Sequence, residues 1–229
     1  MPAQTQLNMK SATAPTAVLF DLDGTLLDTA PDLGAALNTV LQAERRPLVT
    51  AAEYTPLASH GSAGLLRYAY GDEFERRRDE LRDAFLTAYA RNIAANTQLF
   101  EGVTQLLLQL QAQDIAVAIV TNKPHALTAQ LVPHYPELAA IKVIISGDTL
   151  AVAKPDPAPL LHAAQLLGVP KHQCWYVGDA QRDMEAGRRA DMFTVLARYG
   201  YISAHDEPQN WGADAHIDHP AELTNLWLR

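Results

Sequence analysis

Two acidic residues, Asp21 and Asp23, stand two positions apart at the end of a short apolar run. In an extended backbone, residues i and i+2 point to the same side, so both carboxylates are expected to face one site. Asp before Gly24 is also a common turn signal, and capping a turn is the alternative explanation for the pair. Two carboxylates at a buried strand end repel each other unless a cation or a shared proton compensates them. The pattern therefore favours a functional site with a cation or a shared proton over a simple turn.

Phosphoryl transfer is the chemistry that fits these carboxylates. The reaction needs an in-line nucleophile and positive charge around the equatorial phosphate oxygens, and little else. A carboxylate can be that nucleophile, through an aspartyl-phosphate intermediate. Mg²⁺ prefers octahedral oxygen coordination and keeps several waters, so a few carboxylate or carbonyl oxygens can hold it.

Five apolar runs are expected to form the strands that position these residues. Their uninterrupted Val, Ile and Leu side chains are typical of strands buried on both faces of a parallel sheet. The runs cover 17–20, 115–120, 143–145, 174–177 and 193–196. Helical spacing recurs between them, at 103–110 and 160–167. The predicted fold is α/β, a doubly wound Rossmann-like parallel sheet, whose ligand crevice lies beyond the carboxyl ends of its strands.

The interval 28–96 interrupts this alternation because it has helical patterns and no convincing strand. Pro31 fits the first turn of a helix that runs toward Arg45. One face of a longer second helix is expected to be lined by Phe74, Leu81, Phe85 and Tyr89, with the charged run 75–78 on a solvated face. The chain is thus divided into a disordered tail at 1–16, a core of 17–27 and 97–229, and an inserted all-helical cap of 28–96.

Composition excludes several classes of protein. The 229 residues carry a net charge of −8, and 48% of them are hydrophobic. A chain of this kind can bury a large core, and it lacks the concentrated basic face of nucleic-acid binders. Cys174 is the single cysteine and is expected to be a buried structural thiol. No stretch resembles a secretory signal or a membrane span, so a cytoplasmic protein without a membrane or obligate protein partner is expected.

Four motifs in chain order resemble those of the haloacid dehalogenase superfamily in its phosphatase form. Each lies at or just after a predicted strand end, and the similarity covers 17–202. The motifs are Asp21-Leu22-Asp23-Gly24-Thr25-Leu26, then Thr121, then Lys154 in Ala153-Lys154-Pro155-Asp156-Pro157, and finally Gly178-Asp179 with Asp183. Dehalogenases lack the second Asp of the first motif, and the related P-type pumps need membrane helices, so the phosphatases are the better match.

The resemblance implies roles in phosphoryl transfer. Asp21 would attack phosphorus. Asp23 would protonate the leaving alcohol and later deprotonate the water that hydrolyses the intermediate. Thr121 and the backbone at Asn122 would hold phosphate oxygens, and Lys154 would neutralise charge on the nucleophile and the phosphate.

The resemblance also implies a Mg²⁺ site. Asp21, the backbone carbonyl of Asp23, and Asp179 would supply its ligands. Asp183 would act through water or through the ligands themselves. Its alternative role is that of a carboxylate at a helix N-terminus, favoured by the helix macrodipole, and both roles can hold together.

The predicted cap resembles that of phosphoglycolate phosphatases and β-phosphoglucomutases, which implies a small phosphorylated metabolite enclosed by closure. The run Ser59-His60-Gly61-Ser62 resembles a loop that dips toward the phosphate in these relatives. His60 is therefore a candidate substrate contact, with an exposed loop histidine as the alternative. Arg67 is a second candidate, against the usual surface arginine. A phosphomutase and a catalytically silent phosphate-binding module remain as other functions.

The C-terminal segment bears on the substrate. It resembles the N-acetylmuramic acid 6-phosphate phosphatases of bacterial cell-wall recycling. The residues concerned are Tyr199-Gly200-Tyr201-Ile202, Asn210-Trp211-Gly212-Ala213-Asp214 and Asp218-His219-Pro220. Phosphoglycolate phosphatases share the Tyr-Gly-Tyr, and loop packing is a further explanation of the segment. The sequence favours the amino-sugar phosphate, with phosphoglycolate as the alternative.

Overall fold

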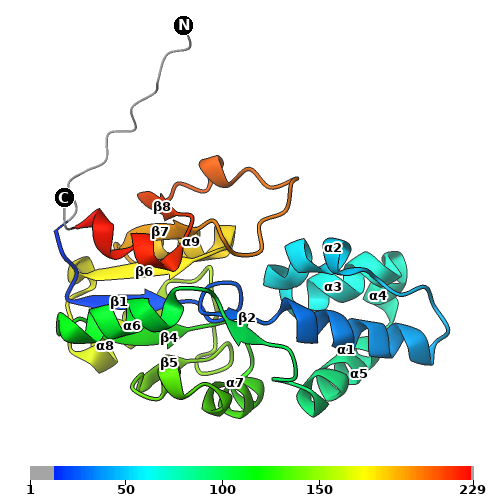
Figure 1. Cartoon of the computed structure of the whole chain (residues 1–229). Coiled ribbons are helices and arrows are strands. Elements are labelled where there is room, and N and C mark those ends of the chain that lie inside the picture. The colour runs from blue at the N-terminus through cyan, green and yellow to red at the C-terminus, as the bar shows by residue number, and fades with distance from the viewer. Residues whose placement is uncertain (1–12, 228–229) are drawn as a thin grey trace, which may run out of the picture.

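The computed structural model describes residues 13–227, so most of the tail expected at 1–16 lies outside the described residues. Six parallel strands form one sheet in the order β5-β4-β1-β6-β7-β8 (Figure 1). Their bounds are Ala17–Phe20 (β1), Ala116–Val120 (β4), Val143–Ile145 (β5), Cys174–Gly178 (β6), Phe193–Ala197 (β7) and Ala215–Ile217 (β8). The α/β class predicted from the sequence is confirmed.

Helices cover both faces of the sheet, and the side chains of β1 alternate between the two resulting cores. Val18 and Phe20 pack in the same cluster as side chains of α6 (Val103–Ala112) and α7 (His125–Leu131). Ala17 and Leu19 pack against side chains of α8 (Ala158–Leu167) and α9 (Gln181–Arg189). The strand order reverses at β1, which lies between β4 and β6. A ligand crevice is therefore expected beyond its carboxyl end.

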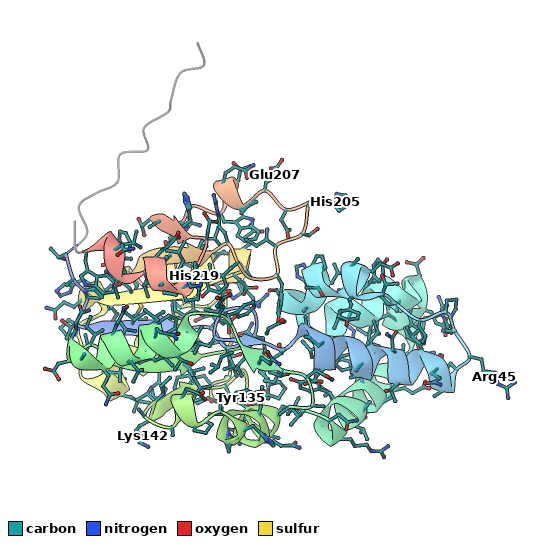
Figure 2. The ribbon with its side chains drawn as sticks, in the orientation of Figure 1. Arg45, Tyr135, Lys142, His205, Glu207 and His219 are labelled. Carbon is teal, nitrogen blue, oxygen red and sulfur yellow. The ribbon has the colours of Figure 1, made fainter. Side chains whose placement is uncertain are left out.

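A helical unit lies beside this edge of the sheet (Figure 1). It comprises α1 (Ala30–Ala43), α2 (Ala51–Tyr54), a 3-10 turn at Thr55–His60, α3 (Gly61–Tyr70), α4 (Asp72–Arg76) and α5 (Arg78–Arg91). Leu37, Leu65 and Phe85 of this unit are fully buried and belong to a hydrophobic cluster that continues to Phe20 of the sheet. Arg45, just after α1, extends at the end of the unit farthest from the sheet (Figure 2).

Two short connections join the helical unit to the sheet. The two-residue strands β2 (Leu27–Asp28) and β3 (Gln98–Leu99) pair antiparallel across them. The buried carboxylate of Asp32, in the first turn of α1, accepts hydrogen bonds from the backbone N–H groups of Asn96 and Thr97 and from both their side chains, at 2.7 to 3.0 Å. One carboxylate thus joins the two connections.

Some expected elements differ in the structure. The longer helix expected over Phe74 to Tyr89 is two helices, because Arg77 leaves helical geometry with φ −120° and ψ 21°. Arg77 binds Glu73 on α4 and Glu80 on α5, and this spans the break. The four apolar residues still share one core. The segment 59–62 is not an open loop, since it closes a 3-10 turn and begins α3.

Cys174 is fully buried in β6, as expected, and burial raises the pKa of its thiol to about 11. Within residues 13–227, no helix combines the length and the apolar character that a membrane span requires.

Candidate active site

Asp21 directly follows β1 and continues its hydrogen bonding, since its N–H donates to the carbonyl of Val177 at 2.9 Å. The carboxylate is buried, and its Oδ1 lies 3.0 Å from Nζ of Lys154 and accepts from the N–H of Leu22 at 2.7 Å. Burial raises the pKa of Asp21, and the charge of Lys154 opposes that rise. Lys154 therefore favours the ionised form that a nucleophile needs.

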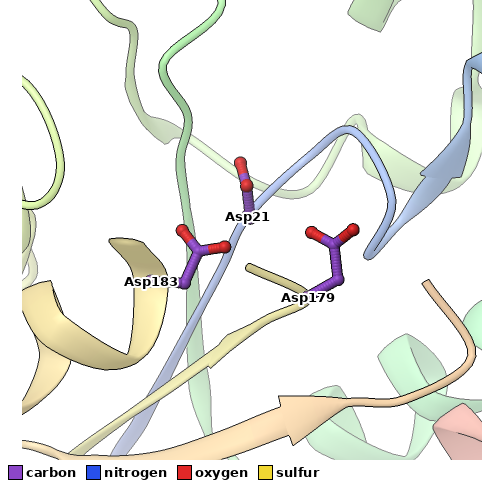
Figure 3. A group of neighbouring side chains, drawn as sticks. All are labelled: Asp21, Asp179 and Asp183. Carbon is purple, nitrogen blue, oxygen red and sulfur yellow. The ribbon is translucent and has the colours of Figure 1, made fainter. Parts of the chain in front are cut away.

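Three buried carboxylates face one another at the ends of β1 and β6. Asp21, Asp179 and Asp183 each offer one oxygen, and these oxygens lie within 4.8 Å of one another (Figure 3). Burial and the charges of its two neighbours raise the pKa of Asp179 to about 7. Hard oxygen donors gathered in this way are the ligands that Mg²⁺ prefers.

Asp179 has a coordination position free among the described residues. Its Oδ2 accepts from the N–H of Tyr201 at 2.9 Å and from the hydroxyl of Ser59, whereas Oδ1 is buried without a partner. A Cβ at Gly24 would lie 2.2 Å from Oδ2, and one at Gly200 would lie 2.3 Å from Cβ of Asp179. The two glycines thus leave room for the carboxylate. A negative cluster with one orphaned oxygen fits a divalent cation.

Asp183 lies in the first turn of α9, as its helix N-terminal alternative predicts, and also contacts Lys154. Its Oδ2 accepts from the N–H of Ala180 at 3.0 Å, at the start of α9, while Oδ1 lies 2.9 Å from Nζ of Lys154. Although burial acts in the opposite direction, Lys154 and Arg182 lower the pKa of Asp183. Lys154 also donates to the hydroxyl of Tyr176 at 2.8 Å. Lys154 is therefore held from three sides, directly against the nucleophile.

The segment after β4 supplies the other wall. The hydroxyl of Thr121 accepts from the N–H of Lys123 at 3.1 Å. The side-chain amide of Asn122 makes two hydrogen bonds with the backbone of Lys154, at 2.9 and 3.0 Å. The side chain of Asn122 is thereby engaged in orienting Lys154, and Asn122 reaches the cleft beside Thr121.

Two cations of the site were not predicted from the sequence. Nζ of Lys123 lies 2.9 Å from Oδ1 of Asp23 and 4.5 Å from the ring centroid of Tyr89, on α5. Arg182 places Nη2 3.7 Å from Oδ2 of Asp21, and its Nε is buried without a partner among the described residues. The only signal in the sequence was their position, within three residues of Thr121 and Asp179.

A cavity of about 770 Å³ separates the sheet edge from the helical unit. The sheet side contributes Asp21, Asp23, Thr121, Asn122, Lys123 and Arg182, and the helical unit contributes Ser59, His60, Arg67, Arg82 and Tyr89, among others. Lys154, Asp179 and Asp183 are fully buried behind this lining. The structure thus brings the residues of all four motifs together, some lining the cleft and the others directly behind its lining.

The two predicted substrate contacts differ in their surroundings. His60 lines the cleft and keeps an exposed face, and the pKa of its imidazole is lowered by partial burial and by the charge of Arg182. Arg67 also reaches the cleft, but its Nη2 and Nε bind Oε1 of Glu75 at 2.8 and 3.2 Å. The charge of Arg67 is therefore already paired.

The Tyr-Gly-Tyr segment has a structural role. The hydroxyl of Tyr199 donates to the carbonyl of Thr25 at 3.0 Å. The hydroxyl of Tyr201 donates to Asp28 at 2.8 Å and accepts from the N–H of Ala30 at 2.9 Å. Together with the bond from the N–H of Tyr201 to Asp179, these contacts connect the first motif, the carboxylate of Asp179 and the start of α1.

Acidic and cationic side chains gathered at the strand ends of a doubly wound sheet are suited to phosphoryl transfer. The family profile described as haloacid dehalogenase-like hydrolase matches residues 18–197. The chain belongs to this family and is a phosphoric monoester hydrolase.

Individual relatives cover nearly the whole chain. A phosphoglycolate phosphatase from Xanthomonas campestris pv. campestris (strain 8004) is 42% identical over 91% of this chain and 95% of its own length. An N-acetylmuramic acid 6-phosphate phosphatase from Pseudomonas aeruginosa is 36% identical over 92% of this chain and 93% of its own. The crystal structure of a predicted phosphoglycolate phosphatase from Haemophilus somnus 129pt superposes with a TM-score of 0.81 at 26% identity, covering 92% of this chain and 97% of that one.

Proposed function

We propose that this chain is a Mg²⁺-dependent phosphatase that hydrolyses a small phosphomonoester through an aspartyl-phosphate at Asp21. The observation that carries the proposal is the placement of Asp21. Its buried carboxylate lies 3.0 Å from Lys154, faces Arg182, and shares a cluster with Asp179 and Asp183. A nucleophile and positive charge thus converge on the place where phosphorus would sit.

The reaction divides into two displacements. In the first, an oxygen of Asp21 forms a bond to phosphorus while the ester P–O bond breaks, and Asp23 gives its proton to the leaving alcohol. In the second, Asp23 takes a proton from water, the water oxygen bonds to phosphorus, and the bond between phosphorus and Asp21 breaks. Nζ of Lys123 lies 2.9 Å from Oδ1 of Asp23, and this contact orients the carboxyl group that acts first as the acid and then as the base.

The metal would be held by Asp21, Asp179 and the backbone carbonyl of Asp23, with Asp183 beside them. When bound, Mg²⁺ supplies positive charge at the phosphate oxygens. Lys154 and Arg182 add charge at the nucleophile. Thr121 and the backbone at Asn122 are positioned to hold the remaining phosphate oxygens.

The helical unit, taken as 28–96, would act as a cap over a core of 17–27 and 97–229. Ser59 supports this role because its hydroxyl reaches Asp179, 120 residues along the chain. His60 and Tyr89 line the same cleft from the helical side. A cap in this position excludes water from the aspartyl-phosphate until the alcohol has left.

N-acetylmuramic acid 6-phosphate is the substrate we favour, because the cleft is large. A volume of about 770 Å³ lies within the range of pockets that enclose whole organic ligands, and a two-carbon ester would leave much of it empty. The name of the Pseudomonas aeruginosa relative supports this substrate. Phosphoglycolate is the second candidate, favoured by the names of relatives that are 42% and 40% identical.

Phosphate release from the two esters, measured side by side with Mg²⁺ and with a chelator, tests the substrate. The comparison uses kcat/KM, in which a tenfold preference is worth about 1.4 kcal/mol. A preference for the amino-sugar phosphate supports the proposal, and a preference for phosphoglycolate replaces it with the second candidate. An isomerised product with little free phosphate would instead indicate a phosphomutase.

The nucleophile is tested by Asp21→Asn, which removes the charge but keeps the shape of the side chain. We expect turnover to fall by at least about 10³-fold, as for loss of other covalent nucleophiles, while the protein stays folded by circular dichroism. Asp83→Asn, an exposed residue of α5, is the matched control and should keep wild-type activity. Full activity of Asp21→Asn would disprove the assignment.

A further inference from the structure

The face of α5 that lines the cleft carries one cation among apolar side chains. Arg82, Phe85, Leu86 and Tyr89 all line the cavity, and their spacing places them on one side of the helix. Phe85 and Tyr89 are fully buried, whereas Arg82 is partly buried. A guanidinium on such a face lies next to whatever the cleft binds.

Arg82 forms no ion pair with any carboxylate of residues 13–227. Within the same residues, its Nε is buried and has no hydrogen-bond partner. The other partly buried arginines of the helical unit, Arg46 and Arg77, both bind Glu44 and Glu73. An unpaired buried donor on a charged group is costly unless a ligand satisfies it. The guanidinium of Arg82 is therefore available to pair with an anion that binds in the cleft.

An anion bound by Arg82 would lie away from the phosphate of the substrate, because Arg82 and the phosphate-binding residues are at different ends of the cleft. Tyr89 contacts Lys123, which binds Asp23 at the phosphate end of the cleft. Arg82 precedes Tyr89 by seven residues, which is two helical turns or about 10 Å along the axis of α5. Because the C-terminal end of α5 leads back to the sheet, Arg82 lies in the part of the cleft farther from Asp21.

We propose that Arg82 binds a carboxylate of the substrate, which is therefore a phosphomonoester carrying a carboxylate well removed from its phosphate. The inference rests on the proposed phosphatase function and specifies the substrate class of the same site. One guanidinium matches one carboxylate in charge and in bidentate geometry. A second phosphate would need further cations, and Arg67, the neighbouring arginine of the cleft, is already bound to Glu75.

The geometry distinguishes the two candidate substrates. In N-acetylmuramic acid 6-phosphate, the lactyl ether is on C3 and the phosphate is on C6, so the carboxylate and the phosphate are separated by C3, C4 and C5 of the ring and by the exocyclic C6. In phosphoglycolate, a single methylene separates the carboxylate from the phosphate oxygen. The first molecule can therefore place its carboxylate much farther from its phosphate than the second, as the separation of Arg82 from the phosphate end of the cleft requires.

The test compares two sugar esters that differ only in the carboxylate-bearing group, N-acetylmuramic acid 6-phosphate and N-acetylglucosamine 6-phosphate. We expect wild-type protein to prefer the first. The variant Arg82→Gln should lower kcat/KM for it by about 10- to 100-fold, the worth of a hydrogen-bonded charge pair, and leave the second ester within about twofold. Arg82→Lys, which keeps the charge but loses the fork, should fall between wild type and Arg82→Gln.

Arg78→Gln provides the matched control, because Arg78 is on the same helix, is exposed, and binds Glu75. It should leave both esters unchanged. Equal effects of Arg82→Gln on the two esters, or no effect on either, would overturn the carboxylate site while leaving the phosphatase intact. A wild-type preference for phosphoglycolate or for a sugar bisphosphate would also overturn it. Failure of the proposed function would differ, since wild type would then release no phosphate from any of these esters.

Discussion

At the scale of single residues, Asp179 occupies an electrostatically unfavourable position for a carboxylate. It is fully buried beside two other carboxylates, and these causes raise the pKa of Asp179 to about 7. The unfolded chain binds this proton only below about pH 4. The contribution of Asp179 to folding stability is therefore greatest at low pH and is lost as pH rises from about 4 to about 7. A bound cation would compensate the charge that appears above that range.

Metal affinity should consequently depend on pH through Asp179. Because a proton and the cation compete for the same oxygens, we expect apparent Mg²⁺ affinity to decrease as pH falls below about 7 and to be nearly constant above it. Isothermal titration at a series of pH values from 5.5 to 8.5 measures this dependence. The variant Asp179→Asn should bind Mg²⁺ weakly at every pH, yet unfold at a higher temperature than metal-free wild type at pH 8. An affinity that does not change with pH would contradict the expectation.

At the scale of helices and strands, uninterrupted apolar runs were sufficient to locate the sheet. The runs 17–20 and 143–145 coincide with β1 and β5, because each of these strands consists of apolar residues alone. The edge strand β8, Ala215–Ile217, was missed because His216 interrupts its apolar residues, so that no apolar run marks it. The break at Arg77 was also missed, since the buried apolar side chains continue through it.

In the candidate site, too, residues marked by a local sequence pattern could be predicted, and residues defined by tertiary contacts could not. The motif residues could be predicted because each follows its own strand, and parallel strands end at one edge. Lys123, Arg182 and Arg82 could not, since their significance depends on what faces them across the cleft. Lys123 contacts Asp23, 100 residues away, and the charge of Arg82 matters only because no carboxylate of the described chain meets it. Pairings of this kind belong to the tertiary structure.

The connections between sheet and helical unit lead to a prediction about Asp32. We expect Asp32→Ala to destabilise the protein by about 3 kcal/mol, because it leaves the buried donors of Asn96 and Thr97 unpaired. Urea unfolding monitored by circular dichroism measures the change. Asp83→Ala, which removes an exposed carboxylate from α5, should stay within about 0.5 kcal/mol of wild type. If the two variants lost similar stability, the bonds of Asp32 would not hold the connections.

At the scale of the whole molecule, the charge of the chain opposes the charge of its substrate. The net charge is −8, and a phosphate ester is an anion. Four carboxylates meet three cations at the site, since Asp21, Asp23, Asp179 and Asp183 face Lys123, Lys154 and Arg182. Without a metal, the phosphate end of the cleft therefore does not attract an anion. Binding of the ester, as well as its chemistry, should depend on the cation.

Removal of the metal should accordingly weaken the binding of phosphate itself. We expect the Kd of inorganic phosphate, measured by isothermal titration, to rise at least about tenfold when Mg²⁺ is replaced by a chelator, since a nearby charge pair at a protein surface is worth more than 1.4 kcal/mol. Repeating the titration at about 1 M salt, where the screening length is only about 3 Å, separates the local effect from the repulsion of the whole chain. The requirement for metal should persist there, because buried charges in contact are screened far less than distant ones. Recovery of phosphate binding by salt without metal would show instead that the long-range charge of the chain, and not the composition of the site, controls the approach of the substrate.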